Sequence, residues 1–139
     1  MNSKKTTIVL SKVYIIICIL SLAYVALLSL YHPQKTMDLV ATDLANTDAI
    51  SSIRGIYGGV GLVITLTLVY LLVTDVFKAL IFLAFFWCAY AISRLITIYV
   101  DGPLGDFGTQ WLVIESALCL IAVILLLYTR KMNGKRVNL

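Results

Sequence analysis

Four ionisable side chains lie inside or at the ends of long apolar stretches of this sequence, and their types and placement make them the first candidates for chemistry. They are Arg54, Arg94, Asp101 and Glu115. An ionised group in hydrocarbon costs about 2.5–3.5 kcal/mol on membrane-insertion scales, so such groups usually face the inside of a helical assembly and pair. Because the two cations and two anions cancel, the sequence predicts one polar cluster rather than four isolated charges.

Depth along the helices sorts these four residues into two pairs. Arg94 lies about 10 Å inward of Asp101, at 1.5 Å of rise per residue, and Glu115 lies about 9 Å inward of the start of the last helix near Thr109. Arg94 and Glu115 therefore form the predicted deep pair. Arg54 in the first turn of one helix and Asp101 in the last turn of another are each repelled by their own helix dipole, so we expect them to neutralise one another as the shallow pair.

Two tyrosines and a set of glycines extend the candidate cluster. Tyr57 belongs to the outer, headgroup end of its helix, and Tyr90 shares a helix face with Arg94 at a spacing of four. Small residues at helical spacing allow a second helix to approach closely. The glycines expected to do so are Gly55, Gly58, Gly59 and Gly61. They do not resemble a phosphate-binding loop, because no strand precedes them and no Gly-Lys-Ser/Thr ending follows.

The elements that position these residues are set by an unusually apolar composition. Of 139 residues, 61% are hydrophobic and only 13% are charged. A globular chain of this length could not bury so much apolar surface in its core, whereas a bilayer accepts it on all sides. The composition therefore indicates an integral membrane protein and disfavours a soluble enzyme, a nucleic-acid binder and a disordered chain.

Four apolar runs are each long enough to cross a bilayer as a helix, which needs about 20 residues. They are Ile8 to Tyr31, Ile53 to Val73, Ala79 to Val100 and Trp111 to Tyr128. His32-Pro33 ends the first run, because proline lacks the N–H of a continuing helix, and the sequence from Asp101 to Asp106 is rich in turn residues. The sequence predicts a single all-α domain, a membrane four-helix bundle with external loops at 32–52 and 101–110 and a basic tail at 129–139.

The first external loop also has helical periodicity. Met37, Val40, Ala41, Leu44 and Ala45 fall on one stripe, which predicts a short helix lying on the outer interface.

Basic residues set the expected orientation, because positively charged segments next to a span stay on the cytoplasmic side. One side of a four-span chain carries most of them: Lys4, Lys5, Lys12, Lys78, Arg130, Lys131, Lys135 and Arg136. The opposite loops hold one lysine, Lys35, among five aspartates. We therefore expect both termini in the cytoplasm. The first run is longer than a signal-peptide core of about 7–15 residues, so we expect it to be retained.

No catalytic or metal-binding constellation accompanies the cluster. Cys18, Cys88 and Cys119 lie in three different apolar runs, and His32 is the only histidine. Such thiols usually pack as small hydrophobes, with a metal site or a disulfide between Cys88 and Cys119 as the lesser alternative. Without a nucleophile–base pair, a metal-ligand set or a nucleotide motif, we expect no enzyme activity, no catalytic residues, no metal and no cofactor.

Short strings in the sequence resemble a known family. The strings are Arg54-Gly55-Ile56-Tyr57-Gly58-Gly59, Ser93-Arg94-Leu95, Asp101-Gly102-Pro103 and Glu115. Between Ala49 and Leu127 the chain is similar to the domain of unknown function 4345 family of small bacterial four-helix membrane proteins. The resemblance implies a bacterial inner-membrane protein with signature positions at Arg54, Gly58, Gly59, Arg94, Asp101 and Glu115, and it implies no activity, substrate or cofactor.

Two functions remain open at this point. The first is a non-enzymatic membrane protein that associates through its helices with itself or with a larger membrane complex, with lipid as its other partner. The alternative is binding or transport of a lipid headgroup or a small anionic or polar ligand in an outward-facing Arg/Glu/Asp cluster. Proton transport with Glu115 as carrier is weaker, because one paired carboxylate makes a poor relay. A cluster that only locks helix order favours the first function.

Overall fold

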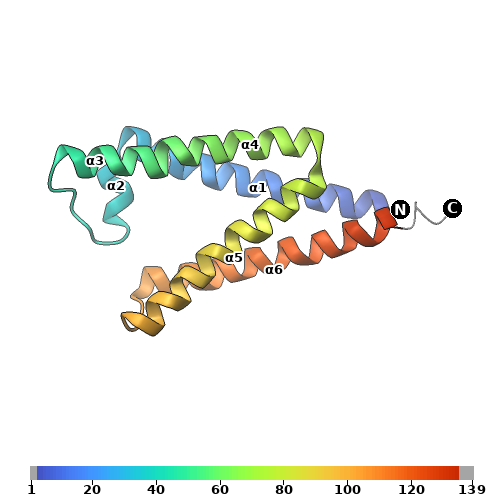
Figure 1. Cartoon of the computed structure of the whole chain (residues 1–139). Helices are drawn as coiled ribbons and strands as arrows, with labels where there is room; N and C mark the ends of the chain where they lie inside the picture. Colours follow the sequence, from blue (N-terminus) through green and yellow to red (C-terminus); the bar gives the residue numbers. More distant parts are fainter. Residues whose placement is uncertain (1–2, 135–139) are drawn as a thin grey trace. The chain divides into compact units, whose positions relative to one another are not determined.

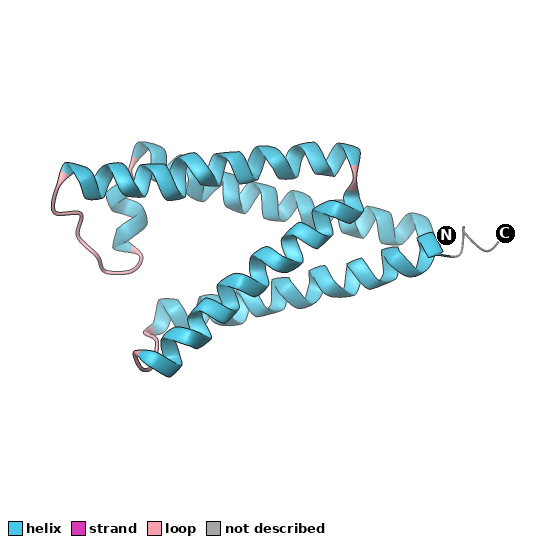
Figure 2. Ribbon diagram, in the orientation of Figure 1, coloured by secondary structure: helices cyan, strands magenta, loops and turns pink. Residues whose placement is uncertain are grey.

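The computed structural model describes residues 3–134, and every regular element in that range is a helix (Figures 1 and 2). The elements are α1 (Ser3–Tyr31), α2 (Pro33–Asp38), α3 (Thr47–Ile53), the π-helix η1 (Arg54–Val60), α4 (Gly61–Thr74), α5 (Val76–Val100) and α6 (Asp106–Gly134). Four stretches are long and apolar enough to cross a membrane: Lys5–Tyr31, Thr47–Thr74, Val76–Val100 and Asp106–Lys131. The predicted all-α fold with four spanning helices is confirmed. Of the basic residues at the C-terminus, Lys135 and Arg136 lie outside the described residues.

The helix boundaries follow from local chemistry. α1 ends at Tyr31, and Pro33 stands in the first turn of α2, where its missing N–H costs nothing. The side chain of Asp75 caps α5 by accepting from the backbone N–H of Lys78 at 3.1 Å. Gly102, with φ of 109°, turns the chain after α5, in a conformation that glycine adopts without strain. α6 begins at Asp106, five residues before the predicted start, where an acidic residue suits the helix N-terminus.

The predicted position of the interfacial helix is wrong. The structure has a short helix, α2, at Pro33–Asp38, whereas the residues between Leu39 and Asn46 are not helical. Ala41 has a positive φ of 52°, which ends any helix at that point. The apolar periodicity was outweighed by proline, which starts the helix early, and by hydrogen bonds of the Gln34 side chain.

Gln34 organises this loop. Its Nε2 donates to Asp38 Oδ1 at 2.7 Å and to the Thr42 carbonyl oxygen at 3.1 Å, and its Oε1 accepts from the Leu44 backbone N–H at 2.9 Å. These bonds satisfy backbone groups that a helix would otherwise have paired.

The chain forms two compact units, which are described separately. The first comprises the start of α1 up to Ile15 together with residues from Thr74 to the end of α6. In this unit α5 and α6 run side by side (Figure 1), and the hydroxyl of Tyr14 donates to the Leu118 carbonyl oxygen at 2.8 Å. Leu80, Leu83 and Ala122 are fully buried. The unit is therefore a helix pair against which the first half of α1 is hydrogen bonded.

The second unit, residues 16–73, contains the rest of α1 and the elements α2 to α4. Glycine lets its two long helices approach: a Cβ added at Gly58 would lie 2.7 Å from Leu30 Cδ2, and one at Gly61 would lie 3.1 Å from Ala26 Cβ. The hydroxyls of Ser29 and Thr36 share a hydrogen bond of 2.9 Å, which ties α2 to the end of α1.

Candidate functional site

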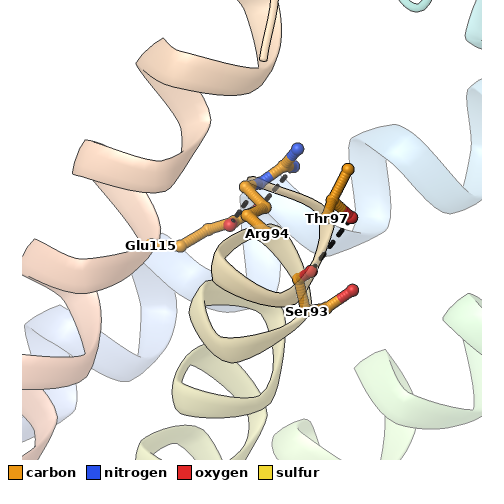
Figure 3. Close-up of polar contacts among 4 residues, drawn as sticks. All are labelled: Ser93, Arg94, Thr97 and Glu115. Carbon is orange, nitrogen blue, oxygen red and sulfur yellow. Dashed lines mark hydrogen bonds and ion pairs between the residues drawn. The ribbon is translucent and has the colours of Figure 1, made fainter. Parts of the chain in front are cut away.

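Arg94 and Glu115 form a two-point ion pair between α5 and α6 (Figure 3). Arg94 Nε donates to Glu115 Oε2 at 2.6 Å, and Arg94 Nη2 donates to Glu115 Oε1 at 2.8 Å. This is the fork geometry in which guanidinium and carboxylate bind most strongly. The Glu115 side chain is only 2% exposed and that of Arg94 is 22% exposed. The predicted deep pair is present, with its charges neutralised inside the helix pair.

The helix termini place the two side chains at one level. Arg94 lies in the last third of α5, and Glu115 lies in the third turn of α6 after a short connecting turn. Next to Arg94, the hydroxyl of Thr97 donates to the Ser93 carbonyl oxygen at 3.1 Å, as Figure 3 shows. The Thr97 hydroxyl is therefore hydrogen bonded within its own helix. The hydrogen bonds to the Glu115 carboxylate come from Arg94.

Arg54 has a partner that the sequence did not indicate. Its Nε donates to the backbone carbonyl oxygen of Leu30 at 3.1 Å. Leu30 lies in the last turn of α1, where carbonyl groups have no partner within the helix and where the dipole favours a cation. The second span begins at Thr47 and not at Ile53, so the predicted place of Arg54 in its first turn is wrong, because the Asn46 side chain caps an earlier helical turn. Arg54 lies about two turns inside this span and is stabilised by the end of another helix.

The predicted pair between Arg54 and Asp101 stays a prediction, because the two residues belong to different units. Asp101 is the residue that ends α5, its backbone N–H donates to the Thr97 carbonyl oxygen at 2.8 Å, and it is exposed.

The segment Arg54–Val60 is a π-helix within the second span, another feature that sequence periodicity did not reveal. π-helical turns are rare and occur frequently at functional sites, because they cost stability relative to an α-helix. The segment coincides with the longest string of the family signature, Arg54 to Gly59.

The predicted packing glycines divide into two groups. Gly58 and Gly61 contact α1, as expected of glycines at a close helix crossing. A Cβ at Gly55 would meet nothing within 4 Å, and one at Gly59 would meet only the Arg54 carbonyl oxygen, at 3.9 Å. Gly55 and Gly59 are therefore not needed for packing against α1.

The two candidate tyrosines have different surroundings. Tyr90 belongs to a row of aromatic rings on α5, with its ring centroid 5.1 Å from that of Phe86 and 6.3 Å from that of Trp87. Tyr90 lies one turn from Arg94 on the same helix. Tyr57 is 38% exposed and lies in the other unit, so the membership of both tyrosines in one cluster stays a prediction.

Metal binding finds no support in the described part of the chain, where no group of three His, Cys, Asp or Glu side chains could hold an ion. Cys18 is buried, Cys88 and Cys119 are partly buried, and none of the three forms a disulfide.

Comparison with known proteins identifies a family without an activity. No curated protein and no solved structure matches the chain. The sequence model of a domain of unknown function, DUF4345, matches residues 10–126, which include most of α1 as well as the region that carries the signature strings. This match covers most of the chain, and the protein therefore belongs to the DUF4345 family of domains of unknown function.

Proposed function

We propose that this protein is a non-enzymatic, multi-pass protein of the bacterial cytoplasmic membrane that acts by associating through its helices, with a second copy or with a larger membrane complex. The observation that carries the proposal is the division of the glycines in the string from Arg54 to Gly59, in which Gly58 packs against α1 while Gly55 and Gly59 are not covered by α1.

The use of the signature charges supports this function. Glu115 receives both of its bonds from Arg94, and Arg54 is bound to the end of α1. An ion pair satisfied by its own helices has no charge left over to hold an anionic substrate. The signature arginines are better explained as residues that hold neighbouring helices together than as residues that bind a ligand.

The open glycine face supports association more directly. Within a bilayer, helices associate by close packing of backbones at small residues, because lipid gives no hydrophobic driving force. Gly55 and Gly59 follow the four-residue spacing typical of such contacts, and neither is covered by α1. Their face is suited to a helix of a partner. The basic residues of the N-terminal tail, the α4–α5 turn and the C-terminal tail favour cytoplasmic termini in this assembly.

Co-purification of two differently tagged copies from mild detergent tests the proposal, with mass spectrometry to identify any other retained membrane protein. We expect a retained partner, and we expect Gly55→Leu combined with Gly59→Leu to reduce its recovery at least tenfold. The matched control is Val63→Leu on α4, at a position that is 62% exposed. A protein that purifies without partners, or a glycine variant that retains them as well as the control does, would contradict the proposal.

One observation favours the second function, binding of an anionic lipid headgroup. The Arg54 side chain is exposed, and no described carboxylate of its own unit pairs with it. Native mass spectrometry would distinguish the two functions. Loss of a bound phospholipid in Arg54→Gln, with the partner retained, would favour headgroup binding over association.

A further inference from the structure

Cys119 of α6 contacts α5 within one helical turn of Cys88. The Sγ of Cys119 donates to the backbone carbonyl oxygen of Ala84 at 3.6 Å. Ala84 precedes Cys88 by one helical turn, so both residues lie on the face of α5 that meets α6.

The backbones are close at this point because the residues are small. A thiol of α6 can reach a backbone oxygen of α5 only where little side-chain volume separates the helices, and Ala84 supplies that position. The Arg94–Glu115 pair fixes the same two helices farther along, which restricts the register of the two cysteines. A disulfide needs Cβ atoms about 3.5–4.5 Å apart, so the proposed bond requires Cys88 and Cys119 to approach to that distance.

We propose that Cys88 and Cys119 form a disulfide that links α5 to α6, with a lipid-soluble quinone as the oxidant. The two thiols lose two protons and two electrons as the S–S bond forms, and the quinone takes up both to become a hydroquinone. This proposal is independent of the proposed function.

The position of the pair indicates the class of oxidant. Cys88 lies midway between Val76 and Val100, the ends of α5, about 18 Å from each at 1.5 Å per residue. Water-soluble oxidants do not reach that depth, whereas membrane quinones do and already drive disulfide formation in bacteria. A dithiol and a disulfide are both uncharged, so this oxidation places no net charge in the hydrocarbon. A complex of two thiolates with a monovalent metal ion would place a net negative charge there.

Counting thiols tests the proposal on the full chain in membranes. The membranes are treated with a short-chain quinone whose ring is fully substituted, so that thiols do not add to it, or with a reductant. They are then denatured, and the protein is labelled with a maleimide polymer that shifts each modified cysteine on a gel. The chain has three cysteines. We expect three labels after reduction and one, on Cys18, after the quinone. Cys88→Ser should accept two labels under both conditions, and Cys18→Ser should change from two labels to none.

Three results would overturn the proposal. They are three labels after the quinone, loss of labels that persists in Cys88→Ser, and a disulfide-linked dimer in place of an internal bond. Oxidation by diamide but not by the quinone would likewise overturn it, because the lipid-soluble oxidant is part of the claim.

Discussion

Both carboxylate oxygens of Glu115 are bound by the guanidinium of Arg94, so a single pair of side chains fastens α5 to α6 at two points. The other signature arginine, Arg54, fastens a different pair of helices through the Leu30 carbonyl oxygen. The two arginines thus act in separate compact units, each on a contact of its own. In the membrane, where water cannot compete, such polar contacts favour one arrangement of apolar helices over others.

Replacing Arg54 should loosen the end of α1. Arg54→Ala removes the donor to the Leu30 carbonyl and the cation near the negative end of the dipole, for an expected loss of about 1 kcal/mol given the exposure of the side chain. Hydrogen exchange in detergent should show faster exchange in the last turn of α1. Arg54→Lys, which keeps the charge, should be intermediate, and unchanged exchange in Arg54→Ala would show that the bond does not stabilise the helix end.

Alanine substitutions at Gly58 and at Gly55 should have different effects on the stability of the protein. At Gly58 a Cβ would lie 2.7 Å from Leu30 Cγ and 3.2 Å from the Leu30 backbone nitrogen, so Gly58→Ala should lower stability by about 1–3 kcal/mol. At Gly55 nothing lies within 4 Å, so Gly55→Ala should leave the melting temperature in detergent equal or slightly higher. Equal losses at both positions would contradict the packing described for α1 and the π-helix.

The start of α5 should respond to acid through Asp75. The backbone N–H of Lys78 and the ammonium group of Lys78 hold the pKa of the Asp75 carboxyl below its usual value. A lowered folded-state pKa means that the carboxylate stabilises the fold above its ordinary pKa and loses this effect as pH falls through the lowered one. Asp75→Asn should keep the cap but remove this part of the acid dependence, measured as melting temperature against pH between about 2 and 6. A variant with the same acid dependence as the native chain would show that Asp75 is not the group involved.

Much of this architecture could be predicted from the sequence. The spans follow from apolar runs interrupted by Pro33, Asp75 and Gly102, each of which ends or caps a helix for a local chemical reason. The pairing of Arg94 with Glu115 follows from depth alone, because buried opposite charges at one level have few other partners.

The remainder depends on contacts that leave no pattern in the sequence. The partner of Arg54 is a backbone carbonyl, which any residue at position 30 would supply. The π-helix at Arg54–Val60 retains an apolar, glycine-rich composition that an α-helix would share. The loop after α2 departs from its helical periodicity because Gln34 binds its backbone, a contact that arises only once the chain has folded.

The central claim is that Arg94 and Glu115 stabilise the protein by binding each other. A double-mutant cycle with Arg94→Ala, Glu115→Ala and both changes, read as stability in detergent, tests it most directly. Removing Arg94 leaves the buried Glu115 carboxylate without a partner, so that single change should cost about 3–5 kcal/mol, and the double change should cost clearly less than the sum of the two singles. Losses that simply add would contradict the account.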